Sequence, residues 1–178
     1  MKIAITGSHR VGKTTLAEKL HEYLTDYNIK TEPYYELEES GYLFSEIPDT
    51  DDFNKLIAYS AEQISTSGDN VIFDRCPIDY FAYIQAIDKS INIQSIFNKV
   101  KSIITEIDLL IFVPIEKPDI ITCAESDLPD LRNRVNEILT DLIWDFGIET
   151  LEVKGTLSDR RDQVISKISQ GFKNKFSF

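Results

Sequence analysis

The chain has 178 residues, of which 42% are hydrophobic, and it carries 19 Lys and Arg residues against 30 Asp and Glu residues. This length and composition predict a single domain over residues 1–178 with a full hydrophobic core. The net charge of −11 argues against a broad nucleic-acid surface, which needs clustered basic side chains, and no apolar run approaches the roughly 18 residues of a membrane span.

Apolar strand-like runs alternate with helical patterns along the chain, which is typical of a parallel α/β sheet. Five strands are predicted, at residues 2–6, near 29–35, and at 71–73, 109–113 and 148–153. Helices are predicted where apolar residues recur every three or four positions, namely after the first strand and over residues 53–64, 78–87, 93–107 and 131–143. A Thr156-x-x-Asp159 capping box predicts a last helix that ends near Gly171.

The residues between the first strand and the first helix match a phosphate-binding loop, or P-loop. The pattern Gly-x-x-x-x-Gly-Lys-Thr is made up of Gly7, Ser8, His9, Arg10, Val11, Gly12, Lys13 and Thr14. Glycines let the backbone curl so that its N–H groups point at phosphate oxygens, and the N-terminus of the following helix adds positive potential. A chance glycine turn is the alternative, which the flanking strand and helix disfavour.

The residue types of this loop suit a nucleoside triphosphate. Lys13 supplies a compact charge for the β and γ phosphates of ATP, and the Thr14 hydroxyl can bind the Mg²⁺ that bridges them. Thr15 continues the predicted nucleotide site, while His9 and Arg10 are expected to contribute backbone N–H groups rather than catalysis. Because the first strand leads straight into the loop, a cleavable leader would remove it, and we expect a cytoplasmic protein.

A second polar pair, Asp74-Arg75, follows the strand at 71–73. At the carboxyl end of a strand beside the P-loop, Asp74 can reach Mg²⁺ or its water shell; capping the next helix is its alternative role. Hydrolytic P-loop ATPases tend to carry a second acid where this chain has Arg75. An arginine there suits gripping a second phosphate or a reacting oxygen, which favours transfer to an acceptor over hydrolysis.

These two elements make the chain resemble the small P-loop kinases of nucleosides and nucleotides. Residues 5–17 are similar to the P-loop of nicotinamide-riboside-kinase-like ATPase domains. Residues 71–80 resemble the strand-end Asp/Glu-Arg element of deoxynucleoside kinases and thymidylate kinase. The resemblance implies a three-layer P-loop NTPase fold, with a five-stranded parallel sheet flanked by helices and a short lid over about residues 114–134.

The resemblance also implies an acid near the acceptor hydroxyl, after the second strand. Glu36 is the candidate that would orient or deprotonate this hydroxyl. Glu38 and Glu39 lie close by, so the choice among the three stays open, and a solvated acidic loop is the alternative. Asp79 lies about one residue from a base- or sugar-recognising Asp of deoxynucleoside kinases, and its alternative is a surface helix residue.

Two further regions follow from the resemblance. Arg132 and Arg134 occupy the position of the arginine-bearing lid of the family. At most one of them would face the phosphates, because helical residues two apart do not share a face. Gly155, after the fifth strand, matches the usual place of adenine contacts.

The predicted function is transfer of the ATP γ-phosphoryl group to a small acceptor, a nucleoside or a nucleoside monophosphate. No nucleic-acid or membrane partner is expected, and dimers are common in similar kinases. The alternatives are a P-loop ATPase or regulatory module without an acceptor, and a protein that holds nucleotide without turnover. A GTPase is disfavoured because the chain contains neither Asp-x-x-Gly nor Asn-Lys-x-Asp.

Overall fold

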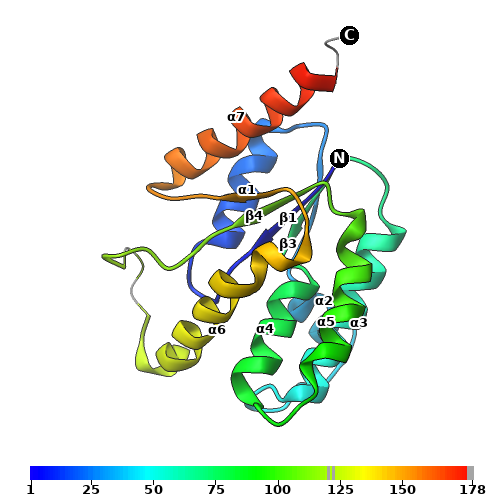
Figure 1. Ribbon diagram of the computed structural model, residues 1–178, viewed down its shortest axis with the longest axis vertical. Helices are drawn as coiled ribbons and strands as arrows, with labels where there is room; N and C mark the ends of the chain where they lie inside the picture. Colours follow the sequence, from blue (N-terminus) through cyan, green and yellow to red (C-terminus); the bar gives the residue numbers. More distant parts are fainter. Residues whose placement is uncertain (120, 122, 176–178) are drawn as a thin grey trace.

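The computed structural model of the protein describes residues 1–119, 121 and 123–175 (Figure 1). Its five strands form one parallel sheet in the order β2-β3-β1-β4-β5. Their bounds are β1 (Lys2–Thr6), β2 (Asn28–Lys30), β3 (Val71–Asp74), β4 (Leu109–Phe112) and β5 (Thr150–Glu152). Because the strands are parallel, the loops that leave their carboxyl ends meet at one edge of the sheet, where α/β proteins place their ligands.

Helices cover both faces of the sheet (Figure 1). One face carries α1 (Lys13–Tyr23) and α7 (Leu157–Lys175). The other face carries α2 (Pro33–Glu39), α3 (Thr50–Thr66), α4 (Pro77–Ile87), α5 (Ile93–Ile103) and α6 (Pro129–Leu142), with the short helices η1 (Ile104–Glu106), η2 (Glu125–Asp127) and η3 (Ile143–Phe146) in the connections. The predicted three-layer α/β fold with a five-stranded parallel sheet is confirmed.

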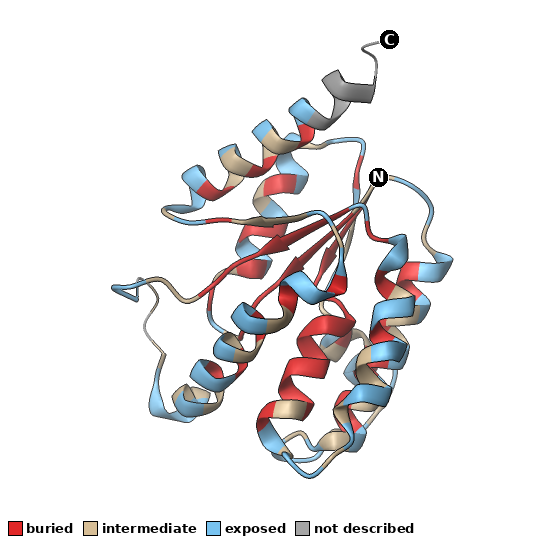
Figure 2. Ribbon diagram, viewed as in Figure 1, coloured by how far each residue is buried: buried red, intermediate tan, exposed pale blue. Residues whose placement is uncertain are grey.

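Each face of the sheet has its own hydrophobic core (Figure 2). Ile3 and Ile5 of β1 pack with α1 and α7, whereas Ala4 between them packs with the helices of the opposite face. Side chains alternate along a strand, so a strand covered on both faces is apolar at every position. This explains why the inner strands appear in the sequence as continuous apolar runs.

The prediction for the second strand was wrong in its latter half. β2 ends at Lys30, and α2 begins at Pro33. Proline fits the first turn of a helix, because its missing N–H has no partner there and its φ is already helical. The aromatic residues Tyr34 and Tyr35 therefore belong to a helical turn and not to a strand.

The last helix differs from its prediction at one end only. Its capping box is present, since the Thr156 N–H donates to Asp159 Oδ2 at 2.9 Å and the Asp159 N–H donates to Thr156 Oγ1 at 3.2 Å. The helix does not stop at Gly171 but continues to Lys175. A single glycine costs a helix only about 1 kcal/mol, so the prediction gave this residue too much weight.

Candidate active site

The loop between β1 and α1 curls at its two glycines. Gly7 has a φ of 153°, and a Cβ atom at this position would lie only 2.4 Å from the Val113 carbonyl oxygen. Gly12 caps α1 with a φ of 86°, in the left-handed region that favours glycine. The N-terminus of α1 therefore opens at the carboxyl end of β1, as a phosphate-binding loop requires.

Lys13 is the buried cation of this loop. Its Nζ donates to the Ser8 carbonyl oxygen at 2.6 Å, and the residue is 4% exposed. Burial, and to a smaller extent the charge of Arg75, lower the pKa of Lys13 to about 8. An ammonium group has three donors, so donors remain for an anion in the loop.

Thr14 and Asp74 meet where α1 begins and β3 ends. Thr14 Oγ1 donates to Asp74 Oδ2 at 2.6 Å, and burial raises the pKa of Asp74. Asp74 Oδ1 is buried without a hydrogen-bond partner in the part of the chain that the structure describes, an arrangement that a bound cation would relieve. The alternative of a helix cap is ruled out, because Cys76 is the N-cap of α4. Thr15, next on α1, is exposed.

The buried Arg75 forms an ion pair with the partly buried Glu32. Its Nε lies 2.5 Å from Glu32 Oε1, although the N–H is not directed at that oxygen, so the contact is ionic. Burial alone would lower the pKa of Arg75, but the charges of Glu32 and Asp79 raise it well above its ordinary value. The backbone of Arg75 has a φ of 76°, a conformation that is costly for a non-glycine residue and concentrates at functional sites.

A cavity of about 220 Å³ opens beside this ion pair. Glu32 and Arg75 form its polar end, whereas most of the remaining wall is apolar or aromatic. Phe53 and Tyr83 stack in this wall, with ring centroids 5.1 Å apart and planes at 17°. A largely apolar cavity with a few convergent polar groups is the usual form of a small-molecule site.

A larger cavity of about 650 Å³ lies beside α6 and the loop after β4, with Glu137, Asp141 and Lys154 in its wall. None of its lining residues belongs to the P-loop or to the Asp74-Arg75 pair. The larger volume of this cavity therefore does not make it the candidate site, which lies at the smaller cavity beside the P-loop.

Glu36 does not reach the small cavity. Its carboxylate accepts hydrogen bonds from Thr31 Oγ1, Tyr59 OH and Gln63 Nε2 at 2.7, 2.9 and 2.8 Å, and none of these residues lines the cavity. The acids that do line it are Glu32 and Asp127, and of these Glu32 lies after the second strand, where sequence reasoning missed it. Pro33 could have revealed it. Proline favours the start of a helix, so the second strand must end before residue 33, and the acid that follows this strand is then Glu32.

Asp79 is fully buried at the start of α4 rather than on its surface. Its Oδ1 accepts the Gly7 N–H and its Oδ2 accepts the Cys76 N–H, both at 3.0 Å. Its Oδ1 also lies 3.5 Å from Arg75 NH1. One carboxylate thus joins the P-loop, Arg75 and the first turn of α4, and Asp79 itself does not line the small cavity.

The two arginines predicted for the lid have different environments. Arg134 is exposed on α6. Arg132 is buried, and its guanidinium donates to the carbonyl oxygens of His9 and Arg10, each at 3.0 Å, and to both carboxylate oxygens of Asp119. Arg132 therefore holds the backbone of the P-loop in this structure.

His9 and Arg10 also contact the segment before α6 through their side chains. His9 Nδ1 lies 2.7 Å from Tyr83 OH, and Nε2 lies 2.5 Å from the Asp127 carbonyl oxygen. Burial lowers the pKa of His9, which favours the neutral ring. A carbonyl can only accept, so we assign the ring proton to Nε2. Arg10 Nε pairs with Asp127 Oδ2 at 3.2 Å.

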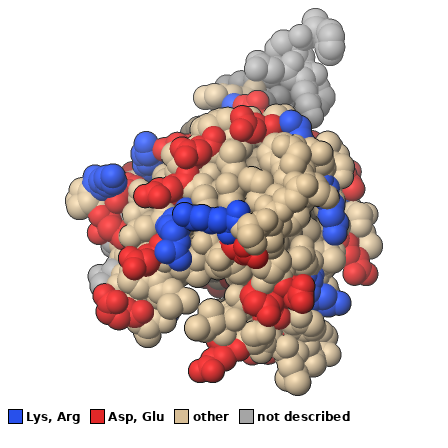
Figure 3. Space-filling model, turned by 60° about the horizontal axis from the view of Figure 1, so that its bottom comes forward, with Lys and Arg blue, Asp and Glu red and all other residues tan. Residues whose placement is uncertain are grey.

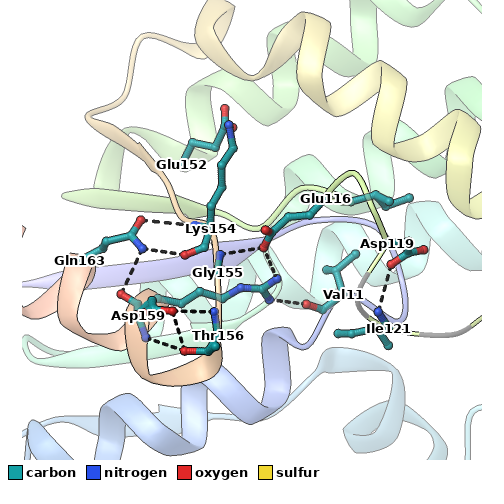
Figure 4. Close-up of polar contacts among 12 residues, drawn as sticks. Val11, Glu116, Asp119, Ile121, Glu152, Lys154, Gly155, Thr156, Asp159 and Gln163 are labelled. Carbon is teal, nitrogen blue, oxygen red and sulfur yellow. Dashed lines mark hydrogen bonds and ion pairs between the residues drawn. The ribbon is translucent and has the colours of Figure 1, made fainter.

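The loop after β5 lies against the P-loop (Figure 4). Arg160 donates to the Val11 carbonyl oxygen and to Glu116 Oε1, each at 2.7 Å, and the Gly155 N–H donates to the same Glu116 oxygen at 2.9 Å. Gly155 has a φ of 94°, and a Cβ atom there would lie 2.9 Å from Asp159 Oδ2. No sequence pattern marks Arg160, which contacts Val11 across 149 residues of chain.

Charged groups are mixed on the face shown in Figure 3, where Lys and Arg side chains lie in small groups beside Asp and Glu. This view contains no continuous basic surface of the kind that binds a nucleic-acid backbone. Among the helices within residues 1–119 and 123–175, none has the length and apolar character needed to cross a bilayer.

The sheet order, the P-loop and the Asp74-Arg75 pair together define the fold of the P-loop nucleoside and nucleotide kinases. The family model AAA_28, described as an AAA domain, matches residues 2–160. The chain therefore belongs to the AAA_28 family. No protein of curated function matches the chain.

Several solved structures have the same fold as this chain. NadR in complex with NR has a TM-score of 0.71 and 19% identity, over 93% of this chain but 48% of the NadR chain, so our chain spans about half of that length. Deoxyadenosine kinase from M. mycoides has a TM-score of 0.64 and 16% identity, over 96% of this chain and 100% of that one. Thymidylate kinase from Candida albicans has a TM-score of 0.66 and 18% identity, over 96% and 91%.

Proposed function

We propose that the protein is an ATP- and Mg²⁺-dependent phosphotransferase that moves the γ-phosphoryl group to a hydroxyl of a small, nucleoside-like acceptor. The observation that carries this proposal is the Glu32–Arg75 ion pair, which stands at the polar end of a cavity whose wall also includes His9 of the P-loop. A P-loop that served hydrolysis alone would need neither an apolar cavity nor an arginine at this position.

The donor side would be formed by the P-loop, Lys13, Thr14 and Asp74. Loop N–H groups and Lys13 would bind the β and γ phosphates, with charge neutralisation as the main catalytic effect. Within the described residues no group of three or more His, Cys, Asp and Glu side chains could hold a metal. The Thr14–Asp74 pair nevertheless fits Mg²⁺, because Asp74 Oδ1 is buried and unpartnered. When bound, Mg²⁺ would neutralise charge on the β and γ phosphate oxygens.

The acceptor side would be formed by Glu32 and Arg75. An ionised carboxylate accepts hydrogen bonds and donates none, so ionised Glu32 could accept one from the acceptor hydroxyl. Glu32 would orient the acceptor hydroxyl and remove its proton. Arg75 would donate hydrogen bonds to the oxygens of the phosphoryl group that is transferred. This assigns to Glu32 the role that sequence alone gave to Glu36.

The remaining predicted residues would support the site indirectly. Asp79 would fix the position of Arg75 relative to Gly7, and Arg132 would hold the P-loop backbone. We further propose that the segment over about residues 114–134, of which residues 120 and 122 lie outside the described part of the chain, acts as a lid. Gly155 and Arg160 would border the adenine of ATP. Both donate a hydrogen bond to Glu116 Oε1, and Arg160 also donates to the Val11 carbonyl oxygen, so they lie beside the P-loop.

The test is transfer of label from ATP labelled at its γ phosphorus to a panel of nucleosides and nucleoside monophosphates, with products separated by chromatography. We expect label in an acceptor, and transfer by Lys13→Ala that is slower on the order of a thousandfold. Release of inorganic phosphate as the only activity, unchanged by any acceptor, would contradict the proposal.

A further inference from the structure

The small cavity has very little unpaired positive charge. Among the described residues that line it, Arg75 is the single Lys or Arg. Arg75 already faces two carboxylates, with Glu32 at 2.5 Å and Asp79 at 3.5 Å. Its charge is therefore balanced before any acceptor enters.

The neighbouring arginines are also paired with carboxylates. Arg10 pairs with Asp127 at 3.2 Å, and Arg132 pairs with Asp119. Four carboxylates (Glu32, Asp79, Asp119 and Asp127) thus surround three arginines (Arg10, Arg75 and Arg132). His9, which also lines the cavity, favours its neutral form because burial lowers its pKa.

A phosphate on the acceptor would be poorly accommodated in these surroundings. A phosphomonoester carries a charge of about −1.5 to −2 at neutral pH and binds where arginines or free N–H groups converge. Arg75 would have to share its guanidinium between this phosphate and the two carboxylates that already face it, Glu32 and Asp79, so its charge is less available to a second anion. The phosphate and Glu32 would also repel each other.

An uncharged or cationic ring meets none of these obstacles. The stacked rings of Phe53 and Tyr83 offer an apolar face, and aromatic faces also attract cations. Asp127 lies in the same wall, and its ion pair with Arg10 leaves no net positive charge there.

We propose that the acceptor cavity selects a nucleoside-like compound whose ring is uncharged or positively charged, and that it discriminates against nucleoside monophosphates. This inference rests on the proposed function, because it concerns the acceptor of that reaction. It goes further by choosing between the two acceptor classes that the sequence left open.

The first test is equilibrium binding of matched pairs, each a nucleoside and its 5′-monophosphate, with one pyridinium nucleoside included. Calorimetry is done on the full chain saturated with Mg²⁺ and a non-hydrolysable ATP analogue, with label transfer from ATP measured in parallel. We expect nucleosides to bind at least about tenfold more tightly than their monophosphates, which equals about 1.4 kcal/mol.

The outcomes separate this inference from the proposed function. Nucleosides that bind selectively but receive no label would support the selectivity and contradict the phosphotransferase. Monophosphates that bind equally well or receive the label would overturn the selectivity and leave the phosphotransferase standing. Absence of binding by both classes would overturn the inference.

A gain-of-function variant provides the second test. Ser126 lines the cavity and is exposed, so a longer side chain can be accommodated there. Ser126→Arg adds an unmatched cation, and we expect it to raise the ratio of monophosphate to nucleoside affinity about tenfold. Ser126→Gln is the control, because it adds length without charge. An equal ratio in both variants would overturn the inference.

Discussion

The two halves of the proposed site, one for the donor and one for the acceptor, are encoded in different ways. The donor half is one contiguous stretch, Gly7–Thr14, whose geometry follows from glycines at fixed spacing between a strand and a helix. The acceptor half is assembled from Glu32 after β2, Arg75 after β3, Tyr83 in α4 and Leu131 in α6. A local motif can thus be identified without a structure, whereas the site that decides the substrate exists only once the sheet has formed.

Lys13→Ala is the change with the largest expected effect, because it removes the buried cation of the donor half. We expect kcat/KM for the nucleotide to fall on the order of a thousandfold. Lys19→Ala is the matched control on the same helix, since Lys19 is partly exposed and pairs with Glu22. Steady-state kinetics on both variants make the comparison, and full activity in Lys13→Ala would refute the donor assignment.

Asp79→Asn tests the residue that joins the two halves. The amide NH₂ group that this change introduces would face a group that is itself a donor or a cation, namely the Gly7 N–H, the Cys76 N–H or Arg75. Because the residue is fully buried, water cannot compensate for this mismatch. We expect a loss of about 3 kcal/mol in the free energy of unfolding and weaker nucleotide binding, measured by urea denaturation and calorimetry. Asp26→Asn, on the exposed surface, should change neither quantity. A loss of stability without any loss of nucleotide affinity would limit Asp79 to the fold.

The protonation of Lys13 should make both stability and nucleotide binding depend on pH. Its pKa is lowered from 10.5 to about 8 by burial, so between these values the folded protein binds fewer protons than the unfolded chain, and this group makes stability rise with pH. Triphosphate affinity should fall over the same range, by up to about tenfold per pH unit, because the cation is lost. Affinity that stays constant from pH 7 to pH 10 would contradict this assignment.

Glu36→Gln has the smallest expected effect. Its carboxylate accepts three hydrogen bonds outside the cavity, of which an amide can keep only part. We expect the free energy of unfolding to fall by about 1 kcal/mol, with turnover per folded molecule little changed. Urea denaturation and kcat measured on the same preparation distinguish this from a catalytic role, which would lower kcat at unchanged stability.

The sequence was sufficient for the sheet, most helices and the P-loop, because each depends on local periodicity or on spacing within one segment. It was insufficient for the acid that we propose for the acceptor half. The end of β2 depends on Pro33, which favours a helix start, whereas the apolar pattern of the same segment also suits a strand. The direction of the Arg132 side chain and the contact of Arg160 with Val11 depend on packing between distant elements. No local pattern encodes such contacts.

The central claim is that Glu32, paired with Arg75, is the acid of the acceptor half. The most direct measurement is kcat for phosphoryl transfer by Glu32→Gln, together with ATP-analogue affinity and urea stability. The account predicts that kcat per folded molecule falls by about 10² to 10⁴, while nucleotide affinity stays close to that of the unmodified protein. The free energy of unfolding should fall by about 1 to 3 kcal/mol, because the buried Arg75 guanidinium loses one of its two carboxylate partners. A Glu32→Gln variant that transfers phosphate within a few-fold of the original rate would contradict it.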